Sequence, residues 1–193
     1  MRTGYEQYDN APGALAMPVD PRRDHIQGSL EAPVVMVEYG DFQCPFCGAA
    51  HPVVKALQAT MGEEMAFVFR HFPLVQVHPM AEPAAEAAEA AGAQGSFWPM
   101  HDLLFTHQEE LSAPTLLQCA AAAGVPDLDR FVMELSERTW APRVREDFES
   151  GVRSGVNGTP SFFLNGRRHE GSYDYPTMLA ALRAEVAARA RTR

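Results

Sequence analysis

The sequence is poor in lysine and contains no long apolar segment. Lys55 is the only lysine, and 16 lysine and arginine residues stand against 25 aspartate and glutamate residues, which gives a net charge of −9. Such a chain attracts phosphate groups weakly, so we expect no nucleic-acid partner. No run approaches the roughly 18 apolar residues that a membrane-spanning helix requires, so no membrane partner is expected either.

The sequence also lacks the basic and apolar pattern of an export signal near its start. An apolar patch at residues 11–19 is interrupted by Pro12 and Pro18 and follows Glu6 and Asp9. We therefore expect a cytoplasmic protein, although a processed export precursor would look the same apart from Met1. Only three cysteines are present. A close cysteine pair in a reducing compartment is more often catalytic or metal-binding than structural.

The apolar and turn patterns predict an α/β chain with a helical insertion. Residues 34–39 and 65–70 predict buried strands, and Asn165-Gly166 predicts the turn of a β-hairpin after Gly155. Helices are predicted at about 45–60, 84–93, 96–108, 114–123, 127–138, 143–154 and 177–190. Glu82, Glu86 and Glu89 recur on one face of the alanine-rich segment and are interpreted as a solvated surface.

This order of elements is that of a thioredoxin-like redox unit, because a strand feeds a helix whose first turn carries Cys-x-x-Cys. We expect residues 1–24 to form an N-terminal tail or loosely docked arm. Residues 25–76 and 155–193 are predicted to form the thioredoxin-like domain, and residues 77–154 an inserted helical domain.

Cys44 and Cys47 are the principal candidates for catalysis. Pro45 falls at the first helical position, so unpaired backbone N–H groups and the helix dipole favour a thiolate at Cys44. Cys47 lies within one turn and can reach back to resolve a mixed disulfide at Cys44. A metal site would need two further ligands. The pairs His71 with His78 and His101 with His107 do not share a helical face, so no metal is expected.

Other candidate residues allow a functional and a structural interpretation. Glu38 interrupts an apolar strand, where it is either a proton acceptor or donor for Cys47 or a strand-end carboxylate that meets solvent or an arginine. Thr159, before Pro160, offers backbone groups that could pair with an extended peptide. Cys119 lies among alanines and is interpreted as a small buried apolar residue.

The chain resembles the DsbA family of thiol–disulfide oxidoreductases, in particular its cytoplasmic thioredoxin-like branch with a CPFC active site. The matching stretches are DHIQGSLEAPVVMVEYGDFQCPFC, RHFPL followed by HPMAEPAAEAAEAAGAQGSFWPMHDLLF, and GVNGTPSFFLNG. The resemblance implies a thioredoxin domain with an inserted helical domain. It implies an exchange activity toward protein or peptide disulfides without a bound cofactor, with a cellular dithiol or glutathione as electron partner.

The resemblance also implies roles for individual residues. Cys44 corresponds to the exposed nucleophile, Cys47 to the resolving cysteine, and Glu38 to a buried acidic position near the pair. Thr159 and Pro160 match a cis-proline loop that holds peptide substrates, and the substrate-binding set is completed by Pro45 and Phe46. Strongly oxidising members have histidine in place of Phe46, so we predict a reduction potential between about −270 and about −120 mV.

Two competing functions stay open at this point. A glutathione-dependent transferase or isomerase on the related fold would typically have serine at the position of Cys44, so retention of both cysteines argues against it. A non-catalytic module that binds a partner beside Pro160 would not need the cysteine pair.

Overall fold

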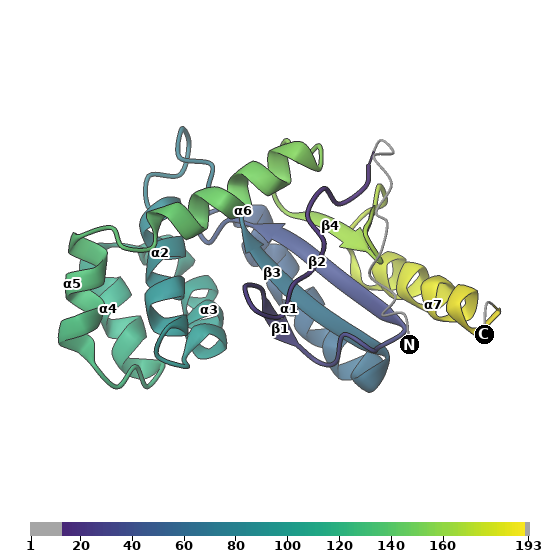
Figure 1. Cartoon of the computed structure of the whole chain (residues 1–193), viewed down its shortest axis with the longest axis horizontal. Helices are drawn as coiled ribbons and strands as arrows, with labels where there is room; N and C mark the ends of the chain where they lie inside the picture. The colour runs from purple at the N-terminus through teal and green to yellow at the C-terminus, as the bar shows by residue number, and fades with distance from the viewer. Residues whose placement is uncertain (1–12, 192–193) are drawn as a thin grey trace. The chain divides into compact units, whose positions relative to one another are not determined.

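The computed structural model describes residues 13–191, which form two compact units (Figure 1). The sheet unit comprises residues 13–39, 50–70 and 149–191, and the helical unit comprises residues 40–49 and 71–148. None of the helices within residues 13–191 combines the length and the apolar character needed to cross a bilayer.

The sheet unit is built on five strands in the order β1-β3-β2-β4-β5. β2 (Val34–Gly40) and β3 (Met65–His71) are buried along their whole length, as their apolar sequences predict. β1 (His25–Gln27) pairs antiparallel with β3, and β4 (Ser161–Leu164) pairs antiparallel with β2. The short β1 was not predicted from the sequence, because three residues carry no recognisable period.

The predicted hairpin is confirmed between β4 and β5 (Arg167–Arg168). Asn165 and Gly166 have φ values of 48° and 79°, which is the left-handed pair that a two-residue hairpin turn requires. The side chain of Asn165 also accepts a hydrogen bond from the backbone N–H of Val35 at 2.9 Å. The turn therefore fixes the hairpin against β2.

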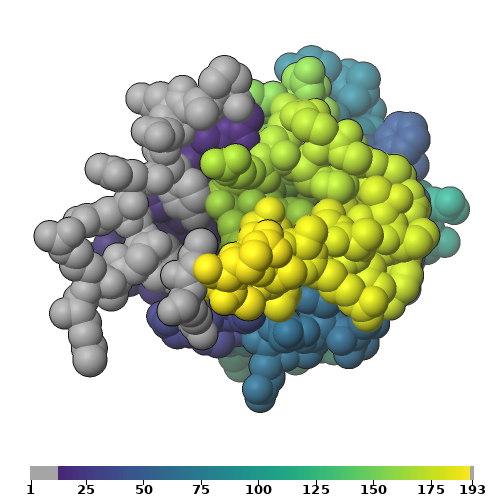
Figure 2. Space-filling view, turned by 90° about the vertical axis from the view of Figure 1, so that its right-hand side faces the viewer, coloured from purple at the N-terminus to yellow at the C-terminus, as the bar shows by residue number. Residues whose placement is uncertain are grey.

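Helix α1 (Pro45–Met61), from residue 50 onward, and helix α7 (Tyr175–Arg191) complete the sheet unit, while residues 45–49 of α1 belong to the helical unit. In Figure 1, α1 runs behind β2 and β3. The helix ends before Gly62, whose φ of 52° glycine adopts without a Cβ penalty, as the sequence predicts. α7 buries Met178 and Leu182, while its outer side forms part of the molecular surface in Figure 2.

The described part of the N-terminal arm, residues 13–24, is docked firmly, so the expectation of a loose tail is wrong there. Leu15 is fully buried, and its backbone N–H donates to the carbonyl of Gly166 at 2.8 Å. The backbone N–H of Ala16 donates to Oγ of Ser154 at 2.9 Å. Residues 1–12, which the prediction also covered, lie outside the described residues.

Arg70 on β3 holds the arm from the interior of the sheet unit. Its guanidinium, fully buried, donates to both carboxylate oxygens of Asp24 at 3.0 and 2.9 Å. It also donates to the carbonyls of Met17 and Pro18 at 2.8 and 3.1 Å, and to the hydroxyl of Tyr39 at 3.0 Å. The arm thus supplies acceptors for a charge that would otherwise be costly to bury.

The helical unit consists of a bundle of short helices that includes α6, which ends in the sheet unit. Ser112 and Asp127 cap α4 and α5 by accepting backbone N–H groups of Thr115 and Arg130. The 3-10 turn η2 (Gln108–Glu110) belongs to this unit, whereas the 3-10 turn η1 (Gly62–Glu64), between α1 and β3, belongs to the sheet unit. The helices are α2 (Ala81–Gly92), α3 (Phe97–Thr106), α4 (Ala113–Ala122), α5 (Leu128–Ser136) and α6 (Ala141–Arg153).

The glutamate stripe of α2 is largely buried, so its interpretation as a solvated surface is wrong. Glu86 and Glu89 are 3% and 4% exposed, while Glu82 is more accessible. Arg138 binds both Glu82 and Glu86 at 2.7 Å. The buried alanines of α2 allow neighbouring helices to approach closely, and the glutamates become buried with their partners.

Candidate functional site

Cys44 occupies the N-cap of α1. Its backbone N–H donates to the carbonyl of Asp41 at 3.1 Å, and its carbonyl accepts the first helical hydrogen bond from Gly48 at 3.1 Å. An N-cap side chain is placed to accept from the unpaired N–H groups of the first helical turn, which favour an anion. Pro45 at the first helical position fixes this geometry without losing a donor.

Cys47 lies on the first turn of the same helix and is fully buried. The backbone N–H of Asp41 donates to its Sγ atom at 3.4 Å. This distance is suitable for a hydrogen bond to sulfur. Cys44, Cys47 and Cys119 are not joined in disulfide bonds.

Cys44 is only 3% exposed, so the exposed nucleophile that the family resemblance implies is not observed. The exposed positions are the two residues between the cysteines. Pro45 is exposed, and Phe46 has 61% of its surface accessible. Gln108 contacts the carbonyl of Cys44 and so adds to the cover of the first turn of α1.

Asp41 is a fully buried carboxylate that organises the turn before the cysteines. Its Oδ1 atom accepts the backbone N–H of Gln43 at 2.8 Å. Its Oδ2 atom accepts the backbone N–H of Leu74 at 2.9 Å and lies 2.7 Å from Nδ1 of His78. These contacts hold the segment around Leu74 and His78 against residues 41–47, here called the cysteine loop.

Gln43 and Gln108 attach the cysteine loop to two further parts of the helical unit. Oε1 of Gln43 accepts the backbone N–H of Met80 at 2.6 Å. Nε2 of Gln108 donates to the carbonyls of Phe42 and Cys44, both at 2.8 Å.

Gly48 leaves room for Gln108. A Cβ atom at Gly48 would overlap Oε1 of Gln108, so alanine fits there only if the Gln108 side chain moves. Phe42 strengthens the attachment by packing against Phe105 and His101, with ring centroids 5.0 and 5.5 Å apart.

Sequence reasoning missed Asp41, His78 and Gln108 as parts of the site. The acidic residue Asp41, close before Cys44 in the sequence, could have been recognised as a candidate site residue. The contacts of His78 and Gln108 join residues that are 37 to 66 positions apart, and no local pattern reports such pairing.

The remaining predicted site residues belong to the sheet unit. Glu38 is 3% exposed on β2 and lies opposite Phe162 of β4. The Thr159–Pro160 peptide bond is cis and directly precedes β4, and both residues are partly exposed. The structure thus places Cys44, Pro45, Phe46 and Cys47 together in the helical unit, while Glu38, Thr159 and Pro160 lie in the other unit.

A second polar cluster of the helical unit surrounds His71. Ligand atoms of His71, Glu89 and Asp147 lie within 4.8 Å of one another. Nε2 of His71 lies 2.9 Å from Oε1 of Glu89. Arg143 lies 2.7 Å from Asp147 and 3.8 Å from Glu89, so a guanidinium already compensates both carboxylates.

Cys119 is 2% exposed, as expected of a small buried apolar residue. Burial raises the pKa of its thiol above the ordinary value. Its Sγ atom lies 3.9 Å from Nδ1 of His107. The raised pKa disfavours the thiolate form that a reactive cysteine requires.

Comparison with known proteins identifies relatives of this arrangement. A family model described as thioredoxin matches residues 21–184. Crystal structures of BdbD from Bacillus subtilis and of alpha-DsbA1 from Wolbachia pipientis superpose with TM-scores of 0.80 and 0.76, at 21% and 20% identity. Each alignment covers 90% of this chain, with 98% of BdbD and 96% of alpha-DsbA1.

Curated relatives carry a different name. A Na(+)/H(+) antiporter NhaA 1 from Salinispora arenicola is 53% identical over 173 residues, and one from Mycolicibacterium gilvum is 41% identical over 172 residues. These alignments cover 90% and 88% of this chain but 26% and 28% of the relatives. The chain spans about a quarter of the length of the curated relatives it matches. By its family model and its fold, the chain belongs to the thioredoxin family and has the DsbA-like form of the thioredoxin fold.

Proposed function

We propose that this chain is a dithiol–disulfide oxidoreductase that exchanges disulfides with protein or peptide substrates through Cys44 and Cys47. The observation that carries the proposal is the placement of both cysteines at the N-terminus of α1, with Cys44 as N-cap and Cys47 one turn on. That placement supports a thiolate at Cys44 and a second sulfur within reach of it.

In the reductive direction, the Cys44 thiolate attacks one sulfur of a substrate disulfide. A mixed disulfide forms, and the second substrate sulfur leaves as a thiolate that takes up a proton. The Cys47 thiol then loses its proton and attacks Sγ of Cys44, which releases the other substrate thiolate. Two electrons pass from the cysteine pair to the substrate, and the reverse sequence oxidises a substrate dithiol.

We assign substrate contacts to Pro45 and Phe46 beside the cysteines and to Thr159 and Pro160 before β4. The exposure of Phe46 supports an apolar contact with a peptide. The backbone of Thr159 would pair with an extended peptide, and Glu38 would exchange a proton with Cys47. We also propose residues 25–76 and 155–193 as the thioredoxin-like domain and residues 77–154 as its insertion. A cytoplasmic location remains a prediction that fractionation of expressing cells would test.

The test is reduction of insulin disulfides by the wild-type chain and by three cysteine variants. We expect Cys44→Ser to abolish turnover and Cys47→Ser to accumulate a mixed disulfide at Cys44. Cys119→Ser serves as the matched control and is expected to retain the wild-type rate. Equal rates for wild type and Cys44→Ser would overturn the proposal. Saturable glutathione binding with turnover that persists in Cys47→Ser would favour a glutathione-dependent transferase instead.

The curated relatives favour a second proposal about the partner. We infer that this chain supplies thiol–disulfide exchange to a membrane cation/proton antiporter, because proteins of that name contain a segment 53% identical to 173 of its residues. The Cys47→Ser chain, expressed with such an antiporter, would trap its partner as a mixed disulfide. Antiporter peptides linked to Cys44 would support this partner. No enrichment over the Cys44→Ser, Cys47→Ser double variant would overturn it.

A further inference from the structure

Asp41 connects the sulfur of Cys47 with a histidine. Its backbone N–H donates to Sγ of Cys47 at 3.4 Å, and its carboxylate lies 2.7 Å from Nδ1 of His78. The Asp41 side chain is fully buried, whereas the His78 side chain is 18% exposed. His78 can therefore exchange protons with solvent while Asp41 cannot.

Covalent geometry bounds the distance between this pair and the cysteines. The carboxylate carbon of Asp41 is three bonds from its backbone nitrogen, which places it within roughly 7 Å of Sγ of Cys47. Adding the contact between Asp41 and His78 places Nδ1 of His78 within roughly 11 Å of the same sulfur. Charges at such distances in a buried site act on each other appreciably.

The net charge of the pair depends on His78. Histidine is the side chain whose charge ordinarily changes between about pH 5 and 8. With His78 protonated, the pair is neutral; with His78 neutral, the Asp41 carboxylate leaves one negative charge beside the cysteines. A negative charge disfavours a nearby thiolate and therefore disfavours the reduced form of the cysteine pair.

We propose that Asp41 and His78 are positioning residues that together set the charge beside Cys47, so that protonation of His78 makes the cysteine pair more oxidising. This inference rests on the proposed oxidoreductase function and deepens it. The contacts of Asp41 with the backbones of Gln43 and Leu74 keep its carboxylate in place in both protonation states of His78.

The ionisable groups on the elements that flank the segment around His78 have partners of their own. His71, at the end of β3, is bound to Glu89, and Glu82, in the first turn of α2, is bound to Arg138. Cys44 and Cys47 on the first turn of α1 are the groups that the pair acts on. The side chain of the partly exposed His78 thus binds a residue whose backbone N–H also contacts Cys47.

The experiment measures the equilibrium in which the Cys44–Cys47 disulfide and two glutathione thiols give the cysteine dithiol and oxidised glutathione. The constant is determined from pH 6 to pH 9 for wild type, His78→Gln and Asp41→Asn, with His169→Gln as the matched control. Glutamine can still donate a hydrogen bond to Asp41 but carries no charge, and asparagine keeps one acceptor oxygen. Circular dichroism and thermal unfolding of each variant establish that it is folded.

We expect opposite deviations in the two variants. His78→Gln should lower the constant about tenfold at the acidic end of the range, where an imidazole is ordinarily charged, and should match the wild type near pH 9. Asp41→Asn removes one negative charge in either protonation state of His78, so it should raise the constant about tenfold across the whole range. A merely structural role would move both constants in the same direction without this dependence on pH.

Constants for His78→Gln that stay within twofold of wild type at every pH would overturn the inference, as would shifts of the same sign in both variants. If Asp41→Asn does not fold, the pH profile of His78→Gln decides alone. A wild-type chain that forms no disulfide between Cys44 and Cys47 would overturn the proposed function, and the inference with it. An intact wild-type couple with unshifted variants overturns the inference only.

Discussion

Replacement of Arg70 by methionine tests whether the N-terminal arm is held by a buried charge. Arg70→Met removes the buried guanidinium that binds the carboxylate of Asp24 at 3.0 and 2.9 Å, and leaves the partly buried Arg23, at 3.1 Å, as its charged partner. Removing one partner of a buried ion pair costs about 3 to 5 kcal/mol. For a chain of this size about 2 to 4 °C is lost per kcal/mol, so the melting temperature should fall by roughly 6 to 20 °C.

Raising the pH does not remove the charge on Arg70 while the protein is folded. Burial alone lowers the pKa of its guanidinium, but the hydrogen bonds and charge interactions with Asp24 and Tyr39 more than offset burial and raise it above its ordinary value. The protein therefore keeps this ion pair throughout the alkaline range in which it is folded.

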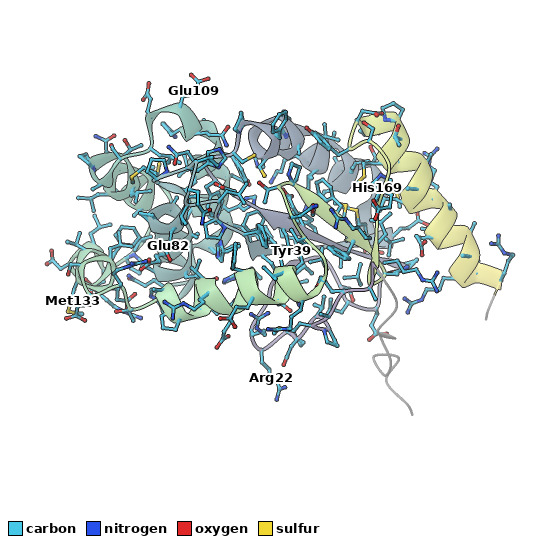
Figure 3. All side chains as sticks on the ribbon, turned by 90° about the horizontal axis from the view of Figure 1, so that it is seen from above. Arg22, Tyr39, Glu82, Glu109, Met133 and His169 are labelled. Carbon is cyan, nitrogen blue, oxygen red and sulfur yellow. The ribbon has the colours of Figure 1, made fainter. Side chains whose placement is uncertain are left out.

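Thermal unfolding and limited trypsin cleavage measure the effect. Arg22, which points away from the arm in Figure 3, is a cleavage site with 88% of its side chain exposed. We expect cleavage after Arg22 to accelerate in Arg70→Met, because the carbonyls of Met17 and Pro18 lose their donor. The double variant Asp24→Leu, Arg70→Met should be less destabilised than Arg70→Met, since no charge stays buried.

Two results would refute this reasoning. One is a loss of less than about 1 kcal/mol in Arg70→Met, which would mean that Asp24 finds other compensation. The other is an unchanged cleavage rate after Arg22, which would mean that the arm is held by its apolar residues. Replacing Arg22 would not test this reasoning, because its ion pair with Asp20 is on the surface and contributes little to stability.

Three further predictions concern the helical unit. In urea unfolding, Gly48→Ala should lose about 1 to 3 kcal/mol, because its Cβ displaces the Gln108 amide from two hydrogen bonds, and regain about 1 kcal/mol, because alanine is favoured over glycine within a helix. Gln108→Ala in that background should relieve the overlap. A Gly48→Ala variant stabilised by the full alanine gain would show that Gln108 keeps its hydrogen bonds. Burial raises the pKa of Cys119, so the thiol binds its proton more tightly in the folded protein than in the unfolded chain. This difference contributes to stability below about pH 8.5, and the contribution is lost as pH rises through the raised pKa. Iodoacetamide should accordingly label Cys119 slowly in the folded state and quickly in guanidinium, and equal rates would be inconsistent with burial. Glu86→Ala should lower the free energy of unfolding by about 1.5 to 3 kcal/mol and Glu82→Ala by about 0 to 1 kcal/mol. The reason is that the Glu86 side chain is 4% exposed and that of Glu82 is 33% exposed. Equal losses in denaturant titrations would show that burial does not distinguish the two residues.

The local sequence was sufficient to predict the elements that carry the cysteines. The apolar run of β2, proline after Cys44 and Gly62 after α1 act over a few residues, so each can be identified from its neighbours alone. The Asn165-Gly166 turn was predicted on the same basis. These features, with the spacing of Cys44 and Cys47, predicted a thioredoxin-like unit, and the resemblance of longer stretches to the DsbA family predicted the family; the comparisons confirm both.

Tertiary structure alone decided which polar residues are buried and what they bind. Glu86 and Glu89 look like a solvated stripe until Arg138, Arg143 and His71 are brought against them by other helices and by β3. The free energy of burying a carboxylate depends on its partner, and that partner lies far away in the sequence.

The same reason applies to the arm and to the surroundings of the cysteines. Arg70 binds Asp24 across 46 positions, and Gln108 binds Phe42 across 66. Asp41 lies close to Cys44 in the sequence, but its hydrogen bond to His78 forms only because the segment after β3 passes beside Asp41. The sequence alone thus determined where the cysteine pair would lie, and the tertiary structure determined which charges surround it, because electrostatic interactions depend on distance in space.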